Sequence, residues 1–102
     1  LLSDAVITPK EINSAYHVYH LYSIRSSMRN KIKETLLKHG IPSVVYYPVP
    51  MHLQKALNFL GYKEGDFPVA EAVSKEILSL PIYPELPDED LHEIAQIIMR
   101  CF

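Results

Sequence analysis

The sequence predicts an α+β domain in which helices pack on one face of a small, mostly antiparallel sheet. Three observations support this fold class. Aromatic and β-branched residues gather in short runs, apolar residues recur at helical spacing in other segments, and the two kinds of segment are interleaved along the chain. With 102 residues, the chain suits a single domain over residues 1–102.

The first part of the chain predicts two strands and a helix. Residues 5–7 are an apolar run typical of a brief strand, and residues 15–24 are dense in aromatic and β-branched side chains that favour a longer one. A helix is expected over about 27–39, where Gly40 supplies a left-handed stop. Its apolar residues recur at every fourth position: Met28, Ile32 and Leu36.

The middle of the chain predicts another strand and two helices. Residues 43–47 form a strand-like run that ends at Pro48, whose ring removes an N–H that a β-ladder needs. A short helix should end at Gly61 and bury Leu53, Ala56, Leu57 and Leu60. Asp66 should cap the next helix, which is expected to end near residue 78. Its buried stripe should consist of Phe67, Ala70, Val73, Ile77 and Leu78.

The last part of the chain predicts an extended segment and a final helix. Residues 79–84 contain two prolines, which suit a sheet edge or a strand end better than a sheet centre. The final helix should begin at about Pro87 and carry acidic residues at its positive end. Its buried face is expected to hold Leu91, Ile94, Ala95 and Ile98.

Composition and charge exclude several classes of function. The formal net charge of −2 gives no positive field to hold a polyanion, so nucleic acid is not expected as a partner. Cys101 is the only cysteine, which excludes an internal disulfide and suits a reducing cytoplasm. No apolar run approaches the roughly 20 residues of a membrane-spanning helix, so no membrane association is expected.

The sequence does not predict a catalytic site that is complete within this chain. His17 and His20 would lie on opposite faces of a strand, so they could not share a metal ion, and no metal site is expected. No Gly-x-Ser-x-Gly turn presents a nucleophilic serine. The three glycines are spread along the chain rather than clustered as a phosphate-binding loop requires.

Residues 46–52, Tyr-Tyr-Pro-Val-Pro-Met-His, are the best candidate for a binding site. Two prolines restrict the backbone of this loop and hold it extended. It would present Tyr47 and His52 at a defined separation, with little conformational entropy left to lose on binding. The alternative is a merely packed turn. Arg25 could separately pair with a carboxylate or phosphate, or be an exposed charge after a strand.

Four blocks of sequence carry a more specific signal: HVYHLYSIR at 17–25, GIPSVVYYPVPMHLQKA at 40–56, LGYKEGDFPVAE at 60–71 and LSLPIYPELPDED at 78–90. In this order they resemble the C-terminal part of the DegT/DnrJ/StrS family of PLP-dependent sugar aminotransferases. The resemblance extends from about Ser14 onward. It implies the C-terminal small domain of a fold-type I aminotransferase, with the N-terminal cofactor-binding domain absent from this chain.

The resemblance also implies an activity for the full-length protein. Such an enzyme transfers an amino group, usually from glutamate, through pyridoxal phosphate (PLP) to a nucleotide-linked keto sugar, for surface polysaccharides or antibiotics. The family implies a homodimer whose missing domain binds PLP, so this chain alone is expected to be inactive. The family's Tyr-Pro-x-Pro-x-His loop helps line the sugar cleft, which implies substrate-binding roles for Tyr47 and His52 and a weaker one for Tyr46.

Other interpretations stay open from the sequence. The chain contains no lysine that suits imine formation, and its size is acceptable for an independent domain, so it could be a non-catalytic module that binds a small ligand. Some relatives carry regulatory names, which suggests a regulatory function as a further alternative. The parent could also be a dehydratase built on the same frame.

Overall fold

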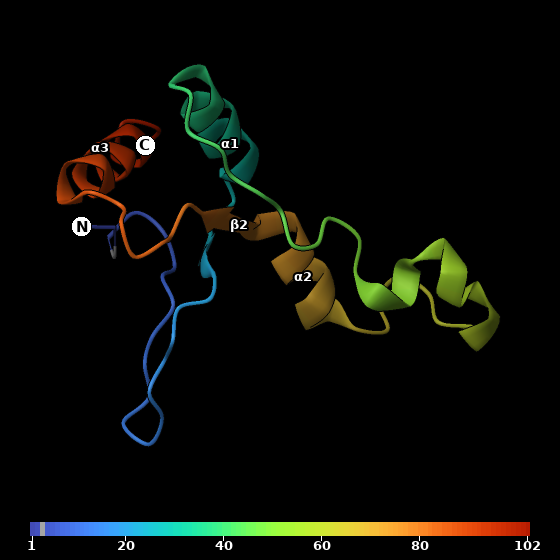
Figure 1. The fold of residues 1–102 in the computed structure, drawn as a ribbon. Helices are drawn as coiled ribbons and strands as arrows, with labels where there is room; N and C mark the ends of the chain where they lie inside the picture. Colours follow the sequence, from blue (N-terminus) through green and yellow to red (C-terminus); the bar gives the residue numbers. More distant parts are fainter. Residues whose placement is uncertain (3) are drawn as a thin grey trace.

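Two short antiparallel strands, β1 (Tyr22–Arg25) and β2 (Ile77–Leu80), lie at the centre of the fold (Figure 1). The computed structural model describes residues 1–2 and 4–102. Isolated antiparallel bridges give each strand one further neighbour: Ile7 with Arg25, and Val44 with Ser79. Strand β2 therefore lies inside this small sheet, between β1 and the segment around residue 44.

The core lies between this sheet and two helices, α1 (Arg29–Lys38) and α3 (Asp88–Met99), which pack against each other (Figure 1). Ile24 of β1 lies opposite Leu78 of β2, and both side chains are fully buried. The helices contribute the other large side chains of this fully buried set: Ile32, Leu36 and Ile98. This arrangement confirms the predicted α+β fold class, with helices over a small antiparallel sheet.

Residues 46–76 form a side lobe that extends away from the core (Figure 1). It contains two 3₁₀ helices, η1 (Met51–Leu53) and η2 (Lys55–Leu60), and the helix α2 (Pro68–Glu76), which leads directly into β2. The radius of gyration, 15.5 Å, exceeds the roughly 13 Å of a compact domain of this length. No helix within residues 1–2 and 4–102 is both long and apolar enough to cross a membrane.

The two core helices confirm their predictions. Helix α1 falls inside the expected range 27–39, and Gly40 beyond it has φ of 74°, as a left-handed stop requires. Helix α3 begins directly after Pro87 with three acidic residues in its first turn. Of its expected buried face, Ile94, Ala95 and Ile98 are buried, Leu91 is exposed, and Ile97 is buried in addition.

The long strand expected at residues 15–24 is wrong for most of its length, because only Tyr22–Arg25 is a strand. The preceding residues form an exposed arm that projects from the core in Figure 1, and Tyr16 is 89% exposed there. Among the described residues, no partner strand pairs with the arm. Local bonds replace a ladder: the His17 N–H donates to Glu11 Oε1 and the Tyr19 N–H to His17 Nδ1.

The other expected strands are shorter than predicted or displaced. Residues 5–7 and 43–47 each contribute one isolated bridge instead of a strand. The segment expected to be extended at 79–84 pairs only up to Leu80, and β2 starts two residues before it. The prolines at 81 and 84 follow the last paired residue, which confirms their expected place at a strand end.

The side lobe corrects two predicted helices. The segment before Gly61 is 3₁₀ rather than α-helical, and Ala56 and Leu60 of its expected buried face are exposed, because no core element reaches them. Asp66 does not cap α2; its carboxylate accepts the Lys63 N–H instead. The expected apolar stripe of α2 is also not buried as predicted. Phe67 and Ala70 are exposed, Val73 and Ile77 are half-buried, and the buried residues of the helix are Glu71 and Ser74. Leu78 is buried as expected, but it belongs to β2 because the helix ends at Glu76.

Candidate functional site

A groove of about 610 Å³ separates the loop at residues 46–54 from helix α2. Its loop side is lined by Tyr46, Tyr47, Val49, Pro50, Met51 and Gln54. Its helix side is lined by residues 66–70 together with Val73, Ser74 and Ile77. This volume is typical of sites that bind small molecules. Apolar residues of α2 and the buried Ser74 face the groove, whereas the buried Glu71 lies outside its lining.

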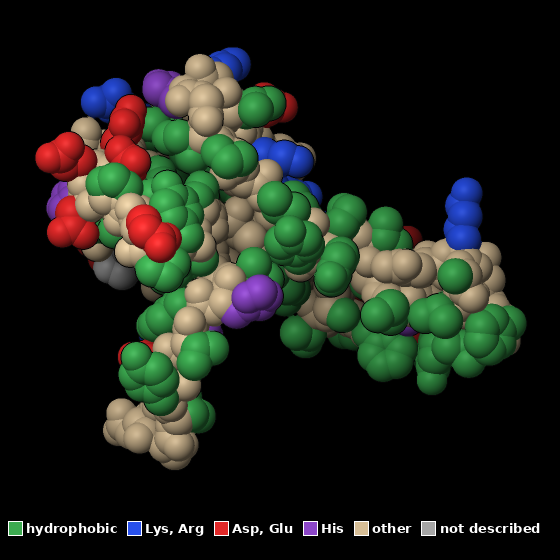
Figure 2. Space-filling view, in the orientation of Figure 1, with side chains coloured by type: hydrophobic (Ala, Val, Ile, Leu, Met, Phe, Trp, Pro, Cys, Tyr) green, Lys and Arg blue, Asp and Glu red, His purple; other side chains and the backbone are tan. Residues whose placement is uncertain are grey.

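The chemistry of the groove is aromatic and apolar. The Tyr46 and Tyr47 rings meet edge to face, with centroids 5.5 Å apart, and Tyr47 is 66% exposed. Figure 2 shows hydrophobic side chains gathered along the side lobe. The polar groups of the lining include the two tyrosine hydroxyls, the Gln54 amide and the Asp66 carboxylate. Such walls suit a ring system that carries a few hydroxyl or carbonyl groups.

The groove does not fit PLP. The cofactor needs a lysine amine for its aldehyde and positive charge or free N–H groups for its phosphate. None of the described residues that line the groove is a lysine or an arginine. Lys31, on α1, donates from Nζ to the carbonyl of Cys101 instead. The described lining of the groove therefore lacks the groups that would hold PLP.

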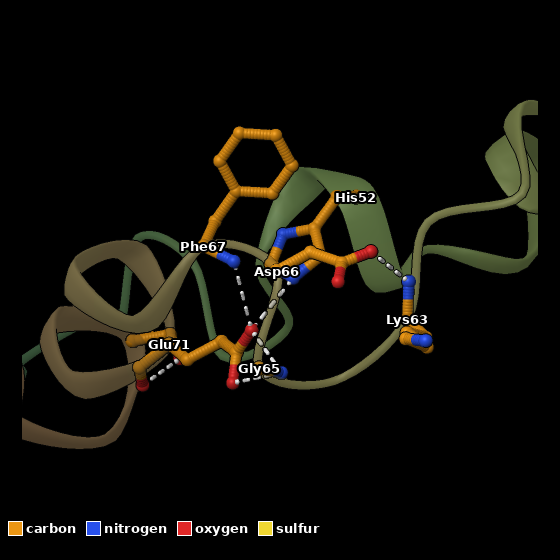
Figure 3. A network of polar contacts seen from close by, with 7 residues as sticks. His52, Lys63, Gly65, Asp66, Phe67 and Glu71 are labelled. Atoms are coloured by element: carbon orange, nitrogen blue, oxygen red, sulfur yellow. Dashed lines mark hydrogen bonds and ion pairs between the residues drawn. The ribbon is translucent and has the colours of Figure 1, made fainter.

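A buried polar network anchors the loop to α2 (Figure 3). His52 Nε2 lies 2.9 Å from Glu71 Oε1, and each residue is only 8% exposed. The Glu71 carboxylate also accepts the Gly65 N–H at 2.9 Å and the Phe67 N–H at 3.4 Å. One carboxylate therefore joins the loop, the turn before the helix and the helix itself.

The start of α2 explains how Glu71 reaches these donors. Pro68 occupies the first helical position, where its missing N–H costs nothing. A side chain in the first turn points back toward the N-terminus of its helix, so the Glu71 carboxylate meets N–H groups that precede the helix. Gly65 adopts φ of 93°, a left-handed conformation that glycine tolerates, and its N–H points at the carboxylate. Negative charge is also favourable at this end of a helix.

The network lowers the pKa of Glu71. Burial alone would raise this pKa, but the hydrogen bonds from His52 and from the backbone N–H groups of Gly65 and Phe67 outweigh the burial. The pKa therefore lies below its ordinary value of 4.5. Glu71 is a carboxylate under all conditions near neutrality.

Acidification is expected to release the loop from α2. Because the folded pKa of Glu71 is lowered, the network stabilises the folded state above pH 4.5 and loses this contribution as the pH falls through the folded value. The measurement is a pH titration of the amide proton shifts of Gly65 and Phe67. Their midpoint should lie below 4.5 and disappear in Glu71→Gln, whereas a midpoint above 4.5 contradicts the lowered pKa.

The four residues predicted as substrate-binding lie in three different settings. Tyr46 and Tyr47 line the groove. His52 lies behind its wall, bound to Glu71 and packed on Phe67 with ring centroids 4.8 Å apart. Arg25 lies outside the groove lining, where its Nη2 pairs with Glu76 Oε2 at 2.8 Å.

Sequence reasoning missed Glu71. Its visible signal is an acidic residue in the first turn after Pro68, which is typical of a carboxylate that caps its own helix. The link from Glu71 to His52 had no local signal, since the two residues lie far apart in sequence.

Comparison with known proteins identifies a family and several named relatives of this chain. A model of the DegT/DnrJ/EryC1/StrS aminotransferase family matches residues 2–99. A pleiotropic regulatory protein of Geobacillus stearothermophilus is 46% identical over 99% of this chain and 27% of its own length. A UDP-N-acetyl-3-dehydro-alpha-D-glucosamine 3-aminotransferase of Acidithiobacillus ferrooxidans is 40% identical over 83% of this chain and 22% of its own length.

Solved structures show the same fold. A DegT DnrJ EryC1 StrS aminotransferase of Brucella abortus superimposes with a TM-score of 0.87 at 38% identity, over 97% of this chain and 26% of that chain. A putative sugar aminotransferase of Streptococcus pneumoniae in its PMP form gives 0.83 at 27% identity, over 94% of this chain and 25% of that chain. The chain thus spans about a quarter of the length of these relatives.

Proposed function

Because the chain belongs to the DegT/DnrJ/EryC1/StrS aminotransferase family, we propose that it is the C-terminal small domain of a PLP-dependent sugar aminotransferase. The full-length enzyme would move an amino group from glutamate to a nucleotide-linked keto sugar, in amino-sugar synthesis for surface polysaccharides or antibiotics. It would act as a homodimer in the cytoplasm, where Cys101 remains a free thiol. The missing N-terminal domain would bind PLP.

The observation that carries this proposal is the aromatic groove beside the loop at residues 46–54. Tyr47 presents both a ring face and a hydroxyl, which suits the uncharged sugar or base ring of a nucleotide-linked sugar, while its diphosphate would have to be bound outside this lining. The lack of cations among its described lining residues restricts the proposed contact to the ring parts of the substrate, and leaves the phosphates of both substrate and cofactor to other parts of the enzyme. The sugar aminotransferases among its relatives support the same role.

The proposal keeps the four predicted substrate-binding residues but divides their roles. Tyr47 and Tyr46 would contact the sugar or its nucleotide directly. His52 would support them from behind, because its ring is buried and its Nε2 is already engaged. A substrate role for Arg25 would require the ion pair with Glu76 to open.

Replacing Tyr47 with alanine in the full-length protein tests the groove. Loss of one stacked ring and one hydroxyl is expected to raise the Kd for the nucleotide-linked keto sugar about tenfold. Isothermal titration with the purified protein measures it, and PLP absorbance should stay unchanged. Tyr83→Ala removes an exposed tyrosine outside the groove lining and serves as the matched control. Equal affinities of both variants would remove Tyr47 from the site.

A regulatory function is the second candidate, because the relative at 46% identity is named a pleiotropic regulatory protein. Such a protein would use the same groove to sense a nucleotide-linked sugar without consuming it. The two candidate functions differ in whether the protein converts the nucleotide-linked sugar. The full-length protein mixed with glutamate and keto sugar yields an amino sugar by mass spectrometry if it is an aminotransferase, and leaves both compounds unchanged if it is a sensor.

A further inference from the structure

We propose that Glu71 is a positioning residue for substrate binding, which holds the Tyr46–Tyr47 wall of the groove in place through His52. This inference rests on the proposed function of the groove. Glu71 does not appear among the residues that line the groove, and its carboxylate is engaged by three donors. It therefore acts on the substrate through other residues and not by contact.

The loop that carries the two tyrosines is fixed at both ends. Before them, Val44 exchanges backbone hydrogen bonds with Ser79 of β2, at 3.1 and 2.8 Å. After them, His52 binds Glu71. Between these two points Pro48 and Pro50 restrict the backbone, so that fixing the ends also fixes the tyrosines. Without the second anchor, the loop would be tied to the sheet at one end only.

The second anchor depends on one polar contact. His52 is the only buried residue of the described range 46–70, so the loop has no hydrophobic core of its own. A buried imidazole without its partner leaves an unsatisfied polar group, which drives the loop to expose it to water. Loss of the Glu71 charge should therefore weaken this anchor and let the loop move.

The same carboxylate also sets the opposite wall. By accepting the Gly65 and Phe67 N–H groups, it fixes the turn from which Phe67 reaches the groove. The Phe67 ring in turn packs on His52 and, at 5.1 Å, on Tyr62. Both walls of the groove therefore depend on Glu71, which predicts an effect on affinity and not on the chemical step.

The test compares Glu71→Gln with Glu64→Gln in the full-length protein. Both changes remove one carboxylate from the same region, but Glu64 is exposed and lies outside the groove lining. Glu71→Gln should raise the Kd and KM for the nucleotide-linked keto sugar about tenfold, as weakened bonds to a charged group predict. The KM for glutamate, the PLP absorbance and kcat at saturating sugar should stay within about twofold of the wild type, and Glu64→Gln should match the wild type.

Two further readouts separate positioning from general damage. Amide hydrogen exchange of Leu53 and Gln54, whose N–H groups donate to the carbonyls of Pro50 and Met51, should accelerate in Glu71→Gln and not in Glu64→Gln, while exchange in α1 and α3 stays unchanged. His52→Phe, which keeps an aromatic ring but has no donor for Glu71, should also raise the KM for the sugar. The double variant should not exceed Glu71→Gln, because both changes remove the same contact. If Glu71→Gln does not fold, His52→Phe removes the contact from the loop side and gives the same comparison.

The outcomes distinguish this inference from the proposed function. A wild-type protein that binds no nucleotide-linked sugar overturns the proposed function and the substrate role of Glu71 with it. A wild-type protein that binds the sugar, together with unchanged exchange and unchanged KM in Glu71→Gln, overturns the positioning role alone. Additive effects of the His52 and Glu71 changes would show that Glu71 does not act through His52.

Discussion

Replacing Ile32 with alanine is expected to destabilise the chain by about 2–5 kcal/mol. Ile32 lies in α1, is fully buried and belongs to the core beneath the sheet. Alanine is a better helix former than isoleucine, so the loss comes from packing and the cavity left behind. Since domains of this size are stable by only about 5–15 kcal/mol, this change removes a large part of the total.

The matched control is Lys33→Ala, one position along the same helix, whose side chain is exposed. It should change the free energy of unfolding by less than about 0.5 kcal/mol. Urea unfolding monitored by circular dichroism measures both variants under the same conditions. A similar urea midpoint for the two variants would contradict the placement of Ile32 in the core.

Under the proposed function, residues 1–102 on their own are expected to hold no PLP and to catalyse no amino transfer. The reason is chemical, because no described residue lining the groove is a lysine and Lys31 is engaged by the Cys101 carbonyl. Borohydride joins PLP irreversibly to the lysine that binds it. Intact mass after reduction should show one PLP on the full-length chain and none on the 11.7 kDa chain.

Each other mass pattern has a defined meaning. A PLP adduct on the 102-residue chain would contradict the assignment of the cofactor to the missing domain. A full-length chain without an adduct would support a regulatory or dehydratase-like protein over an aminotransferase. If the full-length chain carries PLP but does not convert the nucleotide-linked keto sugar, another acceptor of the amino group would have to be tested.

The core helices could be predicted from the sequence because the structure buries the residues that their apolar spacing marks. Ile32 and Leu36 of α1, and Ile94 and Ile98 of α3, each lie on one helical stripe, and these stripes meet the sheet and each other. Periodicity is a sufficient signal when a helix buries the face that its spacing marks. The fold class followed from these two helices and the strand-like runs.

The arm and the side lobe could not be predicted in the same way. The β-propensity of residues 15–21 describes fit to a pleated surface, and no neighbouring strand provides that surface. In α2 the apolar stripe is visible in the sequence, yet Glu71 and Ser74 face inward. In this orientation the Glu71 carboxylate accepts hydrogen bonds from the loop and the turn, which the local hydrophobic pattern does not indicate.

The candidate site could be predicted only in part from the sequence. The two prolines after Tyr47 indicated a stiff loop, and the structure places Tyr46 and Tyr47 on a groove. The burial of His52 was not predictable, because it depends on the position of Glu71 on another element. Sequence spacing indicates stiffness along a loop but not the contacts that hold the loop from behind.

The pairing of β1 with β2 has a consequence for the order of folding. The two strands enclose α1, the 3₁₀ helices and α2 between them along the chain. Closing a loop of this length costs conformational entropy before the sheet contacts have formed. This cost slows folding relative to a helical bundle of equal size. During synthesis β1 must therefore wait until β2 has left the ribosome, and the Val44 bridge to Ser79 can form only then. The contacts that hold the groove, His52 with Glu71 and Val44 with Ser79, lie within residues 44–79, so the groove can be completed only once Ser79 has been synthesised.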